Sequence, residues 1–157
     1  MCADITRLLS SRELEQKSRA ALDLYVKHTG TIKGRGVFAS RPYDRGELVE
    51  SAPVIVFNAC TLPRAIAHVL YNWEQHTGEK GARALALGYG SLYNHDNPSN
   101  LSYQIDAGNK VIRYTAARSI AADEELTINY NAANGQCEPS EDRWFERHGV
   151  ERWAPSR

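Results

Sequence analysis

Apolar and polar residues alternate over short stretches along most of this chain, as they do in half-buried β-strands. Residues 22–27 read Leu-Asp-Leu-Tyr-Val-Lys and show the alternation clearly. Related patterns predict strands at residues 36–39, 48–50, 54–57, 68–73, 101–105 and 111–115. Turn residues such as Thr29-Gly30 and Asp44-Arg45-Gly46 separate them. Many short strands with little helix predict a mainly β domain of the α+β class.

Helix is predicted at a few places. Residues 4–20 read as a helical segment with interruptions, and Ser10 with Glu13 fits a capping box. A short helix is predicted at residues 60–67. Residues 121–126 read as a turn that leads into another helix.

The bulk composition is that of an ordinary soluble domain. The chain has 157 residues, of which 42% are hydrophobic and 24% charged. Lys plus Arg and Asp plus Glu each total 19, so there is no net charge to attract nucleic acid or an anionic membrane. Neither is therefore expected as a partner.

The beginning of the chain lacks the apolar stretch of a secretory signal, and no apolar run is long enough to cross a bilayer. We therefore expect a protein of the nucleus or cytoplasm. Cys2, Cys60 and Cys137 are far apart and odd in number, which argues against a disulfide framework. No Cys or His pairs have the spacing of a structural zinc site, so no metal is expected.

Three short segments carry the candidate chemistry, and the first is Gly34-Arg35-Gly36, preceded by Lys33. Glycines let the backbone approach a ligand closely, although two glycines near a strand are also the mark of a tight turn. The segment lacks the third glycine of a dinucleotide fingerprint and the Lys-Ser/Thr of a phosphate loop. A nucleotide-phosphate cradle is therefore not expected.

The second segment, residues 94–100, reads Asn-His-Asp-Asn-Pro-Ser-Asn and follows an apolar run at residues 84–93. Turn-forming residues of this kind are compatible with a surface loop that caps its own backbone. A polar segment that leaves a buried run must, however, have its polar groups satisfied inside the protein.

The third segment, residues 124–130, reads Glu-Glu-Leu-Thr-Ile-Asn-Tyr. Taken alone it is compatible with a helix start whose Leu126 and Ile128 are apolar. Tyr130 is then simply a core tyrosine with a hydrogen-bonded hydroxyl.

Together and in this order, the three segments resemble the signature motifs of the SET-domain protein-lysine methyltransferases. The resemblance is to the small stand-alone members, of the viral histone methyltransferase type. It implies a β-clip of small curled sheets with a C-terminal pseudoknot. The whole chain, 1–157, is then a single SET domain. Its parts are a helical N-terminal extension (1–21), the SET core (22–131) with an insert (58–82), and a tail without zinc cysteines (132–157).

The resemblance implies S-adenosylmethionine as the cofactor. It assigns cofactor contacts to Lys33, Gly34, Arg35, Gly36, Asn94 and His95. The chain departs from the family's Asn-His-Ser-x-x-Pro-Asn pattern, because Asp96 replaces the serine and Ser99 separates Pro98 from Asn100. Trp144 of the tail is expected either to stack on the cofactor or wall the lysine channel, or to anchor the tail to the core.

The resemblance also implies a catalytic tyrosine, Tyr130, whose hydroxyl lies where the methyl group meets the lysine nitrogen. Tyr103 and Tyr89 are further candidates for the lysine channel. Methyl transfer from a sulfonium to an amine is a direct displacement, so it needs alignment more than acid–base groups.

The expected substrate is a histone lysine. A basic tail suits acidic residues along its groove, for which Glu47, Glu50, Glu74 and Glu79 are candidates, although each is equally compatible with a solvated surface charge. A homodimer is also expected from the resemblance, with Leu8 and Leu9 either at the interface or covering the sheet. The alternatives are a methyltransferase of a non-histone protein, an inactive peptide-binding module of the same fold, and an unrelated β-clip protein.

Overall fold

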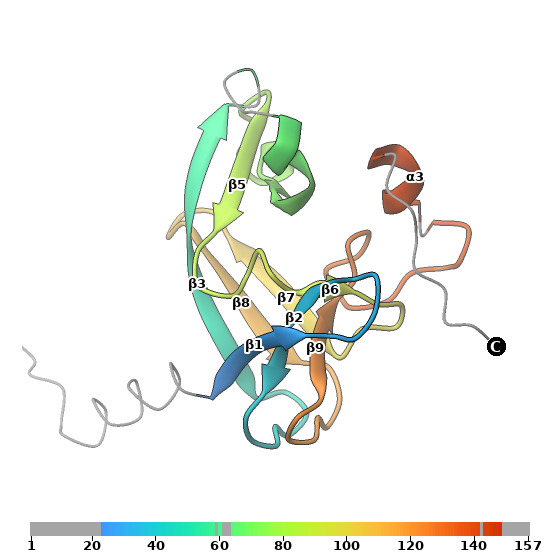
Figure 1. Cartoon of the computed structure of the whole chain (residues 1–157). Helices are drawn as coiled ribbons and strands as arrows, with labels where there is room; N and C mark the ends of the chain where they lie inside the picture. The colour runs from blue at the N-terminus through green and yellow to red at the C-terminus, as the bar shows by residue number, and fades with distance from the viewer. Residues whose placement is uncertain (1–22, 59, 61–63, 142, 149–157) are drawn as a thin grey trace, which may run out of the picture.

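The chain forms two curled sheets that share one hydrophobic core (Figure 1). The computed structural model describes residues 23–58, 60, 64–141 and 143–148. The expected helix at residues 4–20 lies outside these ranges. In the part of the chain that is described, no helix has the length and apolar character needed to cross a membrane.

The first sheet has the strand order β1-β2-β9-β6, and the second has the order β4-β5-β3-β8-β7. The strands of the first sheet are β1 (Leu24–His28), β2 (Arg35–Ala39), β9 (Glu125–Ile128) and β6 (Asn94–His95). Those of the second are β4 (Tyr71–Asn72), β5 (Ala82–Ala86), β3 (Leu48–Asn58), β8 (Val111–Ala116) and β7 (Leu101–Asp106). The helices are the 3₁₀ helix η2 (Arg64–Val69), α2 (Glu74–Thr77) and α3 (Trp144–His148).

The strand β3 is the longest of the described strands and pairs with two other strands. Its residues 48–53 pair with β8, and its residues 54–58 pair with β5 on the other side (Figure 1). Ala52 and Val54 are buried and alternate with the exposed Ser51, Pro53 and Ile55, as the two-residue period of a strand requires. The two strands predicted at 48–50 and 54–57 are therefore one continuous strand.

The predictions for four other strands are confirmed to within two residues at each end. These are β1, β2, β7 and β8. The strand predicted at 68–73 is wrong over most of its length, because η2 extends to Val69 and only Tyr71 and Asn72 pair with β5. Trp73 is almost fully buried, and a short apolar run of this kind does not distinguish a strand from a buried helical turn.

The helix predicted to follow residues 121–126 is also wrong, since the turn leads into the strand β9. Val37 of β2 lies opposite Leu126 in an antiparallel pair, and Asn94 of β6 lies opposite Thr127 in a parallel pair. Leu126, Thr127 and Ile128 are all buried. Partners on both sides, from distant parts of the sequence, therefore override the local helical preference.

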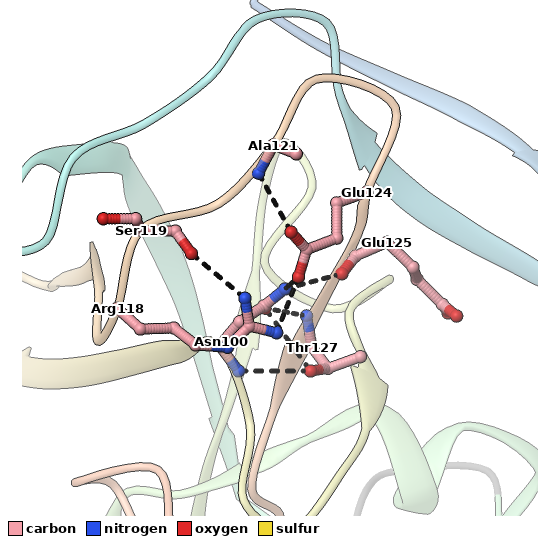
Figure 2. A network of polar contacts seen from close by, with 7 residues as sticks. All are labelled: Asn100, Arg118, Ser119, Ala121, Glu124, Glu125 and Thr127. Atoms are coloured by element: carbon pink, nitrogen blue, oxygen red, sulfur yellow. Dashed lines mark hydrogen bonds and ion pairs between the residues drawn. The ribbon is translucent and has the colours of Figure 1, made fainter.

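The side chain of Asn100 forms hydrogen bonds with the backbone of β9 (Figure 2). Its amide nitrogen donates to the carbonyl of Glu125 at 2.7 Å, and its oxygen accepts from the backbone N–H of Thr127 at 2.8 Å. The amide nitrogen also lies 3.1 Å from Oε1 of Glu124, whose carboxylate pairs with Arg118. The side-chain amide thus makes the hydrogen bonds that the backbone of a neighbouring strand would make. Asn100 is buried, with 2% of its surface exposed.

The tail after β9 lies against residues 97–103. The backbone N–H groups of Ser99 and Tyr103 donate to the carbonyls of Gly135 and Ala133, both at 2.8 Å. Asn97 exchanges two hydrogen bonds with the backbone of Cys137. Together with the parallel β6–β9 pair, these contacts form the interleaved arrangement expected of the pseudoknot. Ser99, the residue that interrupts the family pattern, is buried and bonded within it.

Replacing Asn100 with Ala is expected to lower the free energy of unfolding by roughly 2–4 kcal/mol, because it leaves buried backbone groups of β9 unpaired. Urea denaturation followed by circular dichroism measures the change. The control is Asn109→Ala, which removes a hydrogen bond to Asp106 at an exposed turn and is expected to cost about 0.5 kcal/mol or less. Equal losses in the two variants would contradict the role given to Asn100.

Candidate active site

The two-residue strand β6 joins two groups of candidate site residues. Neighbouring residues of a strand point to opposite faces, so Asn94 and His95 contact different parts of the molecule. The Asn94 side chain contacts β2, while Nδ1 of His95 accepts the backbone N–H of Tyr130 at 3.1 Å. The first motif and the catalytic candidate are therefore fixed relative to each other through β6.

On the Asn94 side, the side-chain nitrogen donates to the carbonyl of Arg35 at 3.1 Å and to Oε1 of Glu125 at 2.7 Å. Gly36 is buried directly beside this pair. A Cβ on Gly36 would lie 2.5 Å from the Glu125 oxygen and 3.0 Å from the Asn94 nitrogen. A side chain at position 36 would therefore require the side chains of Glu125 and Asn94 to move.

The turn that precedes β2 presents Gly34 with a positive φ of 74° and with nothing within 4 Å of where a Cβ would lie. Its carbonyl accepts from the backbone N–H of Thr29, and its own N–H donates to Thr31. Lys33, half-buried, donates its backbone N–H to the Thr31 hydroxyl. The first motif is therefore a closed turn with an open outer surface at Gly34.

Tyr130 lies two residues after the end of β9, and its hydroxyl donates to the carbonyl of Tyr93 at 2.9 Å. Burial is the main reason that the pKa of Tyr130 rises to about 12, and the negative charge of Glu125 adds to it. At neutral pH the phenol is therefore protonated and cannot act as a base. Its oxygen can still accept a hydrogen bond from a ligand, or orient one.

A cavity of about 560 Å³ opens in front of Tyr130. Its walls include the rings of Tyr71, Tyr93 and Tyr103. The Tyr71 and Tyr103 rings meet edge to face with centroids 5.5 Å apart. The structure thus brings the candidates Tyr130 and Tyr103 to one cavity, and adds Tyr71 and Tyr93 to them.

The hydroxyls around this cavity differ in their bonding. That of Tyr71 donates to the carbonyl of Gly90 at 2.7 Å and accepts from Tyr114 at 2.8 Å. Burial raises the pKa of Tyr71 and of Tyr103 above the ordinary value. The Tyr103 hydroxyl makes no hydrogen bond with any residue that the structure describes. It is therefore free to meet a polar group that enters the cavity.

The aromatic residues of α3 pack onto Tyr130. The Trp144 ring lies 4.6 Å from that of Tyr130 in an edge-on contact, and Phe145 lies 5.1 Å from the ring of His95. Trp144 also lines the cavity. This position is compatible with two of the readings left open for Trp144, a wall of the cavity and an anchor of the tail to the core. Phe145 is a neighbour of the site that sequence reasoning did not assign to it.

Tyr89 lies elsewhere. It is not among the residues that line the cavity, and its hydroxyl donates to the carbonyl of Leu24 at 3.2 Å. Tyr71 was missed because it lies within the insert, where no motif marks it. Tyr93 directly precedes Asn94, so its place next to the second motif was the available indication.

The charged groups that line the cavity are basic. They are Arg83 and Arg147, and the imidazoles of His68, His76 and His148 also line it. Among the described lining residues there is no Asp or Glu, so the four candidate glutamates do not lie along it. Glu47 pairs with Arg41, and Glu74 lies 3.6 Å from Arg83. Glu50 bonds to the backbone of Tyr89.

Comparison with known proteins places the chain in a family. The family model described as "SET domain" matches residues 34–131. The chain is 33% identical over 114 residues to the Schizosaccharomyces pombe protein named "Histone-lysine N-methyltransferase, H3 lysine-37 specific". That alignment covers 73% of this chain and 71% of the relative.

Solved structures agree with this family. A Plasmodium falciparum protein provisionally described as a histone methyltransferase superposes with a TM-score of 0.57 at 27% identity, over 69% of this chain and 92% of its own. A chain of the Chaetomium thermophilum Polycomb Repressive Complex 2 gives a TM-score of 0.56 at 20% identity. That match covers 68% of this chain but 14% of the neighbour, and it supports the fold alone.

The chain therefore belongs to the SET-domain family, as the three sequence motifs predicted. Its class is that of the protein-lysine N-methyltransferases.

The residues around Gly36 suit the methionine part of S-adenosylmethionine, which carries a cationic amino group and a sulfonium. Among the described residues, Oδ1 of Asn94 has no hydrogen-bond donor, so it is left to accept one from a ligand. The Glu125 carboxylate beside it would supply a negative charge to a cationic group bound there. The open space at Gly34 would leave room for such a ligand.

Replacing Gly36 with Ala is expected to weaken the binding of S-adenosylmethionine about tenfold, because the new methyl group displaces Asn94 and Glu125. Isothermal titration calorimetry measures the dissociation constant. Gly108→Ala is the control, since its Cβ would meet its nearest neighbour, Oδ1 of Asp106, at 3.8 Å. If both variants bind the cofactor as the wild type does, the contact assigned to this segment is wrong.

Proposed function

We propose that this protein transfers a methyl group from S-adenosylmethionine to a lysine side chain that enters the cavity in front of Tyr130. The observation that carries the proposal is the joint placement of Asn94 and His95. Asn94 contacts the Gly36 segment, and His95 contacts Tyr130. Membership of the SET-domain family supports this assignment of the two sides.

The chemistry of the cavity suits this reaction. The nucleophile is the neutral amine, whereas free lysine has a pKa of about 10.4. Burial in the cavity disfavours the charged ammonium, and so does the positive charge of Arg147 and of Arg83, the latter partly offset by Glu74 at 3.6 Å. The sulfonium of the bound cofactor would act in the same direction. All these effects lower the pKa of a bound lysine.

The protein's own residues then supply alignment. The hydroxyl of Tyr130 is held by the Tyr93 carbonyl, and that of Tyr71 is held by the Gly90 carbonyl. Fixed oxygens of this kind orient the amine lone pair along the line of displacement. Correct positioning alone can contribute roughly 7–11 kcal/mol to lowering a barrier. Tyr130 is already protonated, so the released proton passes to water or to one of the imidazoles that line the cavity.

A histone lysine is the proposed substrate. The support is the S. pombe relative, whose name specifies lysine-37 of histone H3. A non-histone protein remains the alternative, because the described cavity walls carry no acidic residue for a basic tail. A histone substrate is compatible with the nucleus or the cytoplasm. The expected homodimer also remains a proposal, and light scattering coupled to size-exclusion chromatography tests it.

Replacing Tyr130 with Phe is expected to lower kcat about a hundredfold, because it removes an oriented hydroxyl from the reacting centre. The assay follows transfer of a radiolabelled methyl group from S-adenosylmethionine to recombinant core histones. The control is Tyr25→Phe, which removes an exposed hydroxyl that donates to Asp123 and is expected to leave kcat unchanged.

Histone H3 with arginine in place of lysine-37 shows whether that residue is the acceptor. Label that persists on this H3 would point to another lysine, and label on non-histone proteins alone would overturn the histone assignment. Cofactor binding without transfer to any protein would favour the inactive module. If Tyr130→Phe retains full kcat, the role given to Tyr130 is wrong.

A further inference from the structure

Residues 88–93, which lie in the connection between β5 and β6, supply the two carbonyl groups that accept from the hydroxyls of Tyr71 and Tyr130. The Gly90 carbonyl accepts from Tyr71 at 2.7 Å, and the Tyr93 carbonyl accepts from Tyr130 at 2.9 Å. Tyr114 also reaches the Gly90 carbonyl, at 3.3 Å. The positions of two cavity hydroxyls therefore depend on the position of this one connection.

The Ser91 hydroxyl fixes the middle of the connection, by accepting from the N–H of Ala86 and donating to the carbonyl of Val69. The carboxylate of Glu50 on β3 contacts residues on both sides of Ser91. Its Oε1 accepts the backbone N–H of Tyr89 at 2.8 Å, and its Oε2 accepts the hydroxyl of Tyr93, also at 2.8 Å. Gly88 packs so closely on the carboxylate that a Cβ there would clash with Oε1, and its φ is 68°. Glu50 thus contacts the connection at its beginning and at its end.

We propose that Glu50 is a positioning residue of the methyl-transfer reaction, which acts by fixing residues 88–93 and through them the hydroxyls of Tyr71 and Tyr130. The inference rests on the proposed function for its catalytic consequence. Glu50 does not line the cavity, so it does not touch the substrate. Its hydrogen bonds reach Tyr89 and Tyr93, not Gly36 or Asn94, so cofactor binding is expected to be independent of it.

This role differs from that of an ordinary buried ion. Among the described residues no cation pairs with Glu50, whose carboxylate accepts its hydrogen bonds from neutral donors, an amide and a phenol. Burial raises its pKa, while those two donors oppose the rise. A hydrophobic residue of similar size at position 50 would leave the Tyr89 amide and the Tyr93 hydroxyl without their acceptor. Residues 89 and 93 would then lose these hydrogen bonds to β3.

The test compares Glu50→Leu, Glu50→Gln and Tyr93→Phe with the control Glu47→Gln, whose carboxylate contacts Arg41 instead. Glu50→Leu is expected to lower kcat about ten- to a hundredfold with the KM for S-adenosylmethionine unchanged. Glu50→Gln retains an acceptor for the Tyr89 amide and is expected to recover part of kcat. Tyr93→Phe loses one contact, keeps the ring, and is expected to fall between wild type and Glu50→Leu.

Two further readouts separate positioning from simple stability. Mass spectrometry of the product is expected to show altered proportions of mono-, di- and trimethyl-lysine in the Glu50 variants, since the hydroxyls that confine the amine have moved. Hydrogen exchange is expected to speed up at the amides of residues 89–93 before it does so in β7 and β8. If Glu50→Leu does not fold, Glu50→Gln and Tyr93→Phe provide the same comparison.

An unchanged kcat and product distribution in folded Glu50 variants would overturn the proposal. So would a loss of activity matched by an equal rise in the KM for the cofactor. If the wild type itself transfers no methyl group, the proposed function fails. The positioning proposal is then decided separately by whether exchange at residues 89–93 depends on Glu50.

Discussion

The side chain of Asn100 completes the backbone hydrogen bonding of β9, and the arrangement of the site depends on that contact. A single buried amide donates to the carbonyl of Glu125 and accepts from the N–H of Thr127. Backbone groups this deep must be paired, so β9 cannot slide or rotate without breaking these bonds. Since Tyr130 follows β9 by two residues, the position of its ring is set by the same contact.

The parallel pairing of β6 with β9 extends this constraint to the other half of the site. Asn94 and His95 lie opposite Thr127 and Ile128, and their side chains point to opposite faces. The face of Asn94 meets Gly36 of β2, whose strand also pairs with β9. Three segments distant in sequence are thus held in register by one short strand, which explains why each motif is uninformative alone.

Alternation of apolar and polar residues was enough to predict β1, β2, β7 and β8, because each pairs locally in the sequence with an antiparallel neighbour. It did not predict β9 or β6, whose pairing depends on tertiary partners such as Asn100. Most of the candidate site was found through the motifs and their family resemblance. Tyr71 was missed because it lies in the insert. Glu50 was considered as a groove residue or a solvated surface charge, since nothing in the sequence shows which carboxylate is buried.

The chemistry that results depends on geometry more than on proton transfer. Burial keeps Tyr130 protonated well above neutral pH, and no carboxylate is present among the cavity residues described. Such a cavity has no carboxylate to remove a proton from lysine, but it disfavours the ammonium form and leaves water or the lining imidazoles to take the proton. Its contribution is then the fixed direction of a few hydroxyls, each bonded to a backbone carbonyl. Catalysis by alignment requires that the residues supporting the site be held rigidly. Here Asn100 and Glu50 provide that support through buried hydrogen bonds to the backbone, together with the hydrophobic core.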